Sequence, residues 1–322
     1  MGDIDKIELK IMKIEKIARI ENAYLRPVFF DNRARDCWQS ILEYYLKEDS
    51  SYQLILPAYI GWSSNEGSGI FDPVRNLRCN FSFYKLNNNL QIDIEYFKNL
   101  VISSDHKCLV LLVHYFGFPD ARYLELVYWL KVNKVDFIED CAHALLSDYV
   151  GNTCGKMGAM SFYSLHKLLP LKKGGMLVIN NNLERIEKFR SVENINLPWE
   201  YDLNAISEKR RSNYSLINKY LNGNKDIEIL YPELPDGICP QTFPIKLKKN
   251  RDLVYKEMNE AGFGMVSLYH TMIREINCEL FPDSYDLSKH IINFPVHQDI
   301  DFIELKDMVY TFNKIYDKCL SY

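Results

Sequence analysis

The chain has 322 residues, 47% of them hydrophobic, which is ample to bury a large core. Its formal net charge of −4 offers no basic field for nucleic acid or an anionic membrane. No apolar run reaches the roughly 18 residues that span a bilayer, and lysines interrupt residues 1–21 too often for a secretory signal. We therefore expect a cytoplasmic protein with neither nucleic-acid nor membrane partners.

The first half of the chain alternates short apolar runs with one amphipathic stretch. Residues 52–59 and 107–117 are typical of buried strands, and the second run is nearly all apolar, as in strands covered on both faces. Residues 121–134 have helical spacing, with one side formed by Leu124, Val127, Tyr128 and Leu130. A third strand follows over residues 135–140. This strand, helix, strand order predicts a parallel sheet with right-handed crossovers.

Two further strands are expected at residues 157–164 and 174–181, joined by the segment that holds Lys167. After about residue 200 the pattern changes to a smaller α+β unit. It comprises a helix over 208–223, an apolar segment over 238–249, a helix near 250–262, a Tyr/His-rich strand and a final helix near 301–319. The predicted fold is α/β: a mostly parallel central sheet flanked by helices, with a smaller C-terminal domain. We predict domains at residues 25–205 and 206–322, with residues 1–24 packed on the small domain or the surface.

The eight cysteines give no sign of a metal centre or of redox chemistry. None form a CxxC pair, and their spacings along the chain do not match those of zinc sites. Several lie inside apolar runs, as Cys108 does in CLVLLV. Reduced, buried thiols and no metal site are the expectation.

The segment VDFIEDCAHAL places an acidic side chain at the end of a predicted strand. In open α/β sheets, ligands bind outside the carboxyl ends of the strands. Asp140 at such an end can hold a protonated ring nitrogen, the interaction that makes a pyridoxal ring an electron sink. His143 then lies close enough to contact the phenolic oxygen of such a ring. Asp140 could equally cap the following helix, and its position alone does not separate the two roles.

The segment SFYSLHKLLPLKKGG offers a lysine in apolar surroundings. Pyridoxal enzymes need one lysine whose amine is neutral enough to attack an aldehyde, and Lys167 lies between apolar neighbours. Ser161 and Ser164 can supply hydroxyl donors for a phosphate. Lys172 and Lys173 form the solvated pair expected of most lysines.

Other polar and aromatic side chains follow the ends of predicted strands. His114 in LLVHYFG is a candidate substrate residue, although a lone histidine is more often structural. Tyr59 and Trp62 in LPAYIGWSS can stack on a planar ring, although an aromatic residue after a strand is usually part of the core. Tyr269 and His270, in the predicted small domain, are candidates to approach the same site.

Taken in order, these segments resemble the DegT/DnrJ-type sugar aminotransferases, a branch of the fold-type-I pyridoxal 5′-phosphate enzymes. The resemblance runs from about residue 28 to the end and depends most on FIEDCAHAL followed by GKMGAMSFYSLHKLLPLKKGG. It implies that Asp140 binds the pyridine nitrogen, His143 contacts the phenolic oxygen and Lys167 forms the Schiff base and shuttles the proton. It also implies a homodimer with shared active sites. The expected reaction moves an amino group, usually from glutamate, to a nucleotide-linked keto sugar in amino-sugar biosynthesis for lipopolysaccharide or a related cell-surface polysaccharide.

The chain departs from the family pattern at three places. Asn32 and Arg33 stand where the first helix usually begins with a phosphate-cradling Gly-Ser/Thr pair, so charge from Arg33 is expected to replace backbone donors. The turn after the lysine reads Lys-Lys-Gly-Gly over residues 172–175. The loop that normally reaches the dimer neighbour is shortened around 193–208.

Two alternatives stay open. A pyridoxamine-dependent sugar dehydratase carries histidine at the lysine position, and here His166 is adjacent to Lys167. A catalytically retired family member would serve as a sugar-binding or regulatory subunit, which the altered phosphate loop motivates. The retained Asp140, His143 and Lys167 argue against it.

Overall fold

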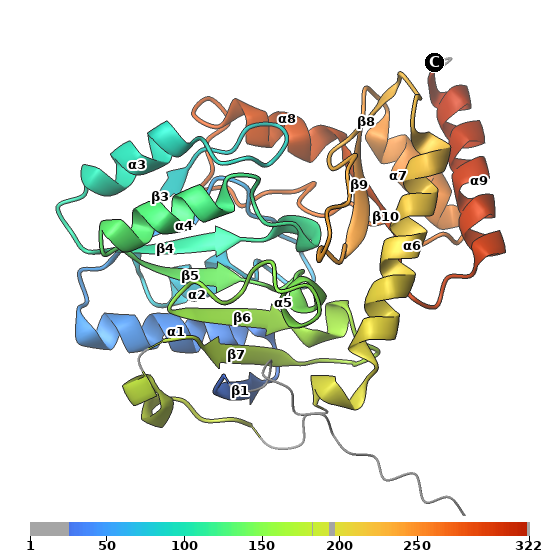
Figure 1. The fold of residues 1–322 in the computed structure, drawn as a ribbon. Coiled ribbons are helices and arrows are strands. Elements are labelled where there is room, and N and C mark those ends of the chain that lie inside the picture. The colour runs from blue at the N-terminus through green and yellow to red at the C-terminus, as the bar shows by residue number, and fades with distance from the viewer. Residues whose placement is uncertain (1–25, 182, 193–196, 321–322) are drawn as a thin grey trace, which may run out of the picture.

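The structure is a computed structural model that describes residues 26–181, 183–192 and 197–320 (Figure 1). The predicted placement of residues 1–24 and part of the shortened segment at 193–208 lie outside this range. Two sheets organise the described residues: one of seven strands from the first half of the chain, and one of three strands from the second half.

The large sheet is mostly parallel and confirms the predicted fold class. Its strands lie in the order β1-β7-β6-β5-β4-β2-β3, and those from β2 to β6 pair in parallel. β7 pairs antiparallel with β6, and β1 pairs antiparallel with β7. The strands are β1 (Val28–Asp31), β2 (Gln53–Pro57), β3 (Asn80–Tyr84), β4 (Cys108–Val113), β5 (Asp136–Asp140), β6 (Met160–Ser164) and β7 (Gly175–Ile179).

Helices cover both faces of this sheet. The strands alternate, so Leu54 and Leu109 pack with α1 and α2 on one face, while Ile55 and Val110 pack with α3 and α4 on the other. Figure 1 shows the resulting layers. The helices of this part are α1 (Ala34–Glu48), α2 (Phe71–Asn76), α3 (Ile94–Ile102), α4 (Tyr123–Val132) and α5 (Leu145–Tyr149), with short 3-10 turns η2 (Tyr115–Gly117), η3 (Leu165–Lys167), η4 (Leu183–Lys188) and η5 (Pro198–Glu200).

The prediction of which side of α4 is buried was wrong at two of its residues. Val127 and Leu130 are buried as expected, but Leu124 and Tyr128 are each 72% exposed. The core side of the helix is completed instead by Tyr123 and Leu126. The helix is apolar nearly all round, so its sequence left the inward direction ambiguous.

The second half of the chain forms a small antiparallel sheet in the order β10-β9-β8. Its core joins the core on the α3 and α4 face of the large sheet, because Phe243 and Ile245 belong to the same cluster as Val110. The elements are α6 (Leu203–Leu221), β8 (Ile227–Ile229), β9 (Thr242–Leu247), α7 (Arg251–Glu260), α8 (Pro282–His290), β10 (Ile291–Pro295) and α9 (Phe302–Leu320). The division into domains at residues 25–205 and 206–322 stays a prediction. No helix among the described residues is long and apolar enough to cross a membrane.

The predicted Tyr/His-rich strand is wrong, because residues 267–271 form turns. Tyr269 has a φ of 63°, a left-handed conformation that breaks an extended chain. The segment nevertheless reaches the large sheet: the amide of Trp62 donates to the carbonyl of Thr271 (2.9 Å), and that of Ile273 donates to the carbonyl of Ile60 (3.0 Å). This segment from the second half of the chain therefore lies against the loop that follows β2.

Candidate active site

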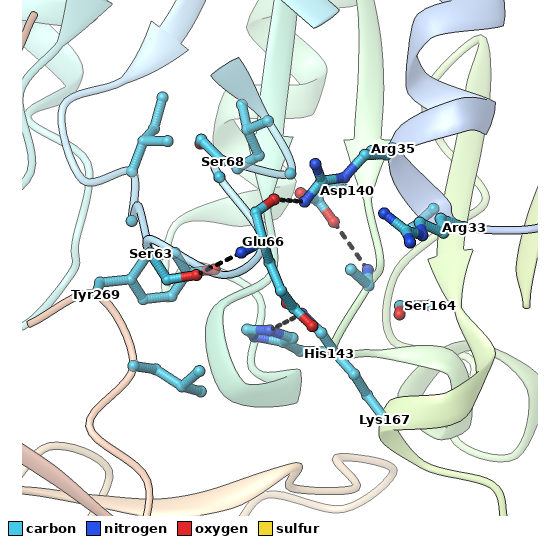
Figure 2. Close-up of a pocket in the computed structure, with 18 of the residues that line it drawn as sticks. Arg33, Arg35, Ser63, Glu66, Ser68, Asp140, His143, Ser164, Lys167 and Tyr269 are labelled. Atoms are coloured by element: carbon cyan, nitrogen blue, oxygen red, sulfur yellow. Dashed lines mark hydrogen bonds between the residues drawn. The ribbon is translucent and has the colours of Figure 1, made fainter. Parts of the chain in front are cut away.

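A cavity of about 470 Å³ opens at the carboxyl ends of the parallel strands, where the sequence predicted a ligand site. Its walls come from the segments that follow β2, β4, β5 and β6, from the start of α1 and from residues 267–270 (Figure 2). The predicted site residues that line it are Arg33, Trp62, His114, Asp140, His143, Ser164, Lys167, Tyr269 and His270.

Lys167 and His143 meet inside this cavity. The Nζ atom of Lys167 lies 2.8 Å from Nε2 of His143, and Figure 2 shows the two side chains converging. The amide of Phe116 donates a hydrogen bond to the other ring nitrogen of His143, Nδ1, over 3.2 Å. In a neutral imidazole an accepting Nδ1 places the proton on Nε2. His143 is thus arranged to donate to Lys167.

This arrangement requires a neutral amine on Lys167, and the electrostatics agree. Burial lowers the pKa of Lys167, and the nearby charges of Asp140 and Glu66 only oppose that effect. Burial is the main cause that holds the pKa of His143 well below its usual value, and a proton on Lys167 would lower it further. A neutral lysine that accepts a hydrogen bond has the form that attacks an aldehyde.

Asp140 presents one free carboxylate oxygen to the cavity. It ends β5, and its Oδ1 accepts a hydrogen bond from the amide of Ala142 over 2.8 Å, so the capping role foreseen from sequence is present. Within the described residues, Oδ2 has no hydrogen-bond partner, although the side chain is only 5% exposed. Burial raises the pKa of Asp140 to about 6, against the lowering effects of Ala142 and Lys167. A cationic N–H donor would relieve this cost.

His114 lines the cavity, and its imidazole ring is paired with the carboxylate of Glu139. Its Nε2 lies 2.8 Å from Oε2 of Glu139, and both side chains are buried. Burial lowers the pKa of His114, but Cys154 and Glu139 outweigh it and raise that pKa to about 9. The pair is a buried ion pair, which is the structural role that the sequence left open for His114.

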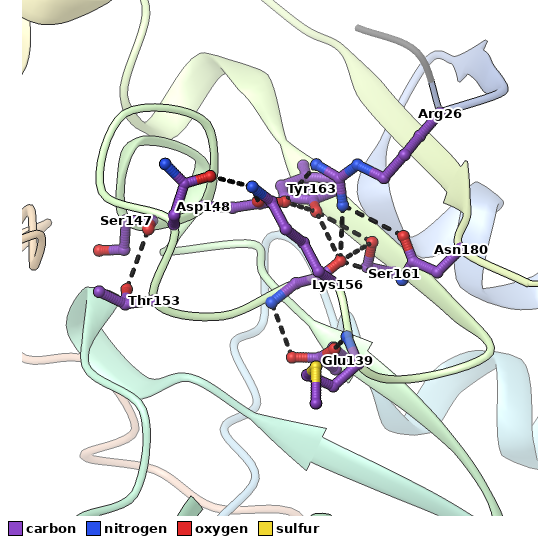
Figure 3. Close-up of polar contacts among 12 residues, drawn as sticks. Arg26, Glu139, Ser147, Asp148, Thr153, Lys156, Ser161, Tyr163 and Asn180 are labelled. Carbon is purple, nitrogen blue, oxygen red and sulfur yellow. Dashed lines mark hydrogen bonds and ion pairs between the residues drawn. The ribbon is translucent and has the colours of Figure 1, made fainter. Parts of the chain in front are cut away.

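The two candidate serines lie on opposite faces of β6. Ser164 faces the cavity with Phe162, whereas Ser161 points the other way with Tyr163, because successive strand residues alternate. The Oγ of Ser161 donates to the carbonyl of Gly155 (3.0 Å) within a buried polar network around Asp148 (Figure 3). The structure does not bring Ser161 to the cavity.

Asn32 and Tyr59 also lie outside the cavity wall. The Oδ1 of Asn32 accepts a hydrogen bond from the Nζ of Lys173 over 2.5 Å. Tyr59 is fully buried, with its ring 5.1 Å from that of Tyr269. Among the predicted tyrosine and tryptophan residues, the ones that line the cavity are instead Trp62 and Tyr269.

Sequence reasoning missed the loop between β2 and α2 as a cavity wall. Glu66 extends toward Lys167 in Figure 2, and its carbonyl accepts a hydrogen bond from Arg35. Ser63 and Ser68 lie on the same loop and also line the cavity. The Gly/Ser-rich stretch SSNEGSG after a buried strand was the available signal, because such loops commonly carry binding residues.

The donor set fits pyridoxal phosphate. Lys167, whose pKa burial lowers, and the free Oδ2 of Asp140 share one cavity, as the aldehyde and the pyridine nitrogen require. For the phosphate, the start of α1 opens on the cavity, since Arg33 and Ala34 line it, and Ser164 adds a hydroxyl. A helix N-terminus attracts anions through its unpaired amides and dipole.

Comparison with known proteins agrees with the motifs. Residues 81–198, which include Asp140, His143 and Lys167, match the DegT/DnrJ/EryC1/StrS aminotransferase family. The dTDP-4-dehydro-2,3,6-trideoxy-D-glucose 4-aminotransferase of Saccharopolyspora spinosa is 23% identical over 66% of this chain and 66% of its own length. The UDP-4-amino-4,6-dideoxy-N-acetyl-beta-L-altrosamine transaminase of Campylobacter jejuni is 22% identical over 73% of each chain. The chain thus spans about two thirds to three quarters of the length of these relatives.

Solved structures share the fold. Helicobacter pylori PseC, an aminotransferase involved in the biosynthesis of pseudoaminic acid, has a TM-score of 0.74 at 17% identity, over 90% of this chain and 87% of that one. The putative sugar aminotransferase Spr1654 from Streptococcus pneumoniae, in its PMP form, has a TM-score of 0.71 at 13% identity, over 91% and 87%. The chain is thus similar to the DegT/DnrJ/EryC1/StrS aminotransferase family over residues 81–198, and it shares the fold of solved sugar aminotransferases.

Proposed function

We propose that this protein is a pyridoxal phosphate-dependent aminotransferase that transfers an amino group from an amino acid, glutamate by preference, to a nucleotide-linked keto sugar. The observation that carries the proposal is the 2.8 Å contact between Lys167 and a neutral His143 in a cavity that also holds Asp140. Neither an ordinary solvated lysine nor a family member that has lost its catalytic activity would require a buried lysine paired with this histidine.

The proposed mechanism assigns one task to each of the three side chains. When bound, pyridoxal phosphate supplies an aldehyde that exchanges with amines and a ring that withdraws electrons. The Oδ2 of Asp140 holds the proton on the ring nitrogen and so maintains that withdrawal. With the cofactor bound, Lys167 would act as the free amine: its Nζ would take the proton from the donor's α-carbon and deliver it to the carbon that carried the aldehyde. His143 orients Nζ through Nε2.

The phosphate end of the cofactor is assigned to the start of α1. Arg33 is the N-cap residue and lines the cavity, and its guanidinium is a donor that cannot cap the helix amides. It therefore remains available to pair with an anion, and Ser164 faces the same cavity. The positive charge of Arg33 replaces some of the backbone N–H donors that bind the cofactor phosphate in typical members of the family.

The nucleotide-linked sugar is the substrate class that the named relatives favour, since their names specify dTDP- and UDP-linked sugars. Lys172 and Lys173, exposed at the cavity mouth, give that mouth a positive charge suited to a diphosphate. The proposal extends to a cytoplasmic homodimer with shared active sites that serves amino-sugar synthesis for lipopolysaccharide or a similar polysaccharide. These parts follow from family resemblance.

The test is turnover of UDP- and dTDP-linked 4-keto sugars with glutamate, with products identified by mass spectrometry. The wild type should yield an amino sugar and 2-oxoglutarate. Lys167→Ala should yield neither, while Lys131→Ala, an exposed lysine on α4, should behave as the wild type. Turnover by Lys167→Ala would contradict the proposal, and a product that has lost a hydroxyl without gaining an amine would favour the dehydratase.

A further inference from the structure

A cluster of soft metal ligands lies beside the cofactor cavity. One imidazole nitrogen of His114 and the sulfur atoms of Cys141 and Cys154 lie within 4.8 Å of one another. The three residues are 2%, 0% and 3% exposed, and both cysteines are free thiols. They come from the ends of β4 and β5 and from the loop before β6, so no spacing along the chain predicts the cluster.

Glu139 positions two of the three ligands. Its Oε2 lies 2.8 Å from Nε2 of His114 and accepts a hydrogen bond from the amide of Gly155, next to Cys154, over 2.7 Å. Its Oε1 accepts hydrogen bonds from the amides of Met157 and Gly158, each over 2.8 Å. One buried carboxylate thus fixes both the imidazole ring and the loop that carries Cys154. Metal-binding histidines are commonly oriented by such a carboxylate.

The third ligand, Cys141, is held by the backbone of the sheet. Its amide donates to the carbonyl of Phe162 over 2.9 Å, and its side chain is fully buried. The donor set is therefore ordered before an ion arrives, which reduces the entropic cost of binding. His114 also lines the cavity, so an ion has an entry path from solvent.

We propose that His114, Cys141 and Cys154 form a binding site for a thiophilic divalent cation, with Zn²⁺ as the expected ion. Two thiolates and one imidazole are a common protein ligand set for zinc, with a fourth position open to water. On binding, the two thiols and the imidazolium of His114 each release one proton to solvent, and the two thiolate charges balance the ion. The contacts that define this site do not depend on the proposed transamination. Because Cys141 follows Asp140 directly, an ion here would couple to the cofactor site.

The first test is titration of the full-length reduced protein with Cd²⁺, which reports thiolate coordination by ultraviolet charge-transfer absorption. We expect one Cd²⁺ per chain with the intensity of two thiolates, and displacement by Zn²⁺. Cys141→Ala and Cys154→Ala should each weaken binding at least tenfold. Cys79→Ala, which removes a buried thiol outside the cluster, should leave it unchanged. An unchanged titration in Cys154→Ala, or no charge-transfer band in the wild type, would overturn the proposal.

A second measurement keeps the test independent of the variants' folding. X-ray absorption at the zinc edge of the wild-type protein with one equivalent of Zn²⁺ should show two sulfur ligands and one imidazole. A shell of oxygen and nitrogen alone would place the ion elsewhere and refute the assignment. The conservative Cys154→Ser variant, with its circular dichroism compared to the wild type, separates loss of a ligand from loss of structure.

Discussion

The amide of Phe116 donates to Nδ1 of His143, and this one hydrogen bond directs the proton on the other ring nitrogen toward Lys167. Phe116 adopts a left-handed backbone with a φ of 56° in the turn after β4, and its ring stacks on the imidazole with centroids 6.0 Å apart. The turn after β4 therefore fixes the tautomer of His143, which follows β5.

The reactivity of Lys167 toward an aldehyde should begin at a lower pH than that of an ordinary lysine. Burial lowers its pKa from 10.5, so the neutral amine is already populated below that value. The rate of pyridoxal phosphate addition, followed by absorbance against pH, should show its inflection below 10.5. His143→Gln, which removes the donor on Nε2, should slow this rate by about tenfold or more. An inflection at the usual lysine pKa would contradict the neutral pair.

Asp140→Asn should lower the activity of the enzyme and raise the stability of the cofactor-free protein. Turnover should fall by about 100-fold or more, because a neutral amide cannot hold the proton on the ring nitrogen. In the cofactor-free protein the variant should be more stable than the wild type above pH 6. Burial raises the pKa of Asp140 from 3.8 to about 6, so its ionisation costs stability as pH rises through that window, on the order of 3 kcal/mol in all.

Denaturant unfolding of the cofactor-free proteins at pH 5 and pH 8 checks this claim. The stabilisation of Asp140→Asn should be largest at pH 8 and smaller at pH 5. Equal stability of the two proteins at pH 8 would mean that Asp140 is well solvated in the absence of cofactor.

Gly61 leaves room for the ring of Tyr269. A Cβ atom at Gly61 would lie 2.4 Å from Cδ1 of Tyr269, so Gly61→Ala must displace the ring from the cavity wall. Overpacking of this kind costs roughly 1–3 kcal/mol, and we expect about tenfold weaker cofactor binding by fluorescence titration. The double variant Gly61→Ala/Tyr269→Ala should bind the cofactor no more weakly than Tyr269→Ala alone. Additive losses would show that the two residues act independently.

Glu139→Gln should be among the most destabilising conservative substitutions in the chain. Burial alone would raise the pKa of Glu139, but the hydrogen bond and charge of His114, with the Gly158 amide and Tyr123, lower it to about 2. Breaking a buried pair of this kind costs roughly 3–5 kcal/mol, whereas Glu208→Gln on the exposed side of α6 should cost little.

The stability lost in Glu139→Gln should become smaller as the pH falls. A carboxylate with a lowered pKa stabilises the fold above its unfolded value of 4.5, and that contribution disappears as pH falls toward 2. Urea unfolding should therefore show the gap between wild type and Glu139→Gln narrowing below about pH 4.5. A gap that stays constant down to pH 3 would argue against the ion pair.

The sequence was sufficient to predict five of the seven strands of the large sheet, β2, β4, β5, β6 and β7, but it gave no strand at β1 or β3. The run VDFIED became β5, and the rule that ligands bind at carboxyl strand ends correctly brought Asp140, His143 and Lys167 to one cavity. Long apolar strands and a strand-end carboxylate are local signals, so they can be read without knowledge of distant contacts.

What could not be predicted depends on orientation and on contacts between distant segments. Ser161 and Ser164 look alike in sequence, but only the register of β6 determines which one faces the cavity. Tyr269 enters the site through a left-handed turn that no pattern in SLYHTM indicates. Cys154 and His114 are far apart in sequence but close in the fold, where Glu139 contacts His114 and accepts a hydrogen bond from the amide of Gly155, next to Cys154.

The most direct measurement of the central claim is the visible absorption spectrum of the purified protein with pyridoxal phosphate, before and after glutamate. The account predicts a yellow band that is lost on adding glutamate. Borohydride reduction before that addition should then place the cofactor on Lys167 in the peptide map. Absence of the band, or reduction at a different lysine, would contradict the account.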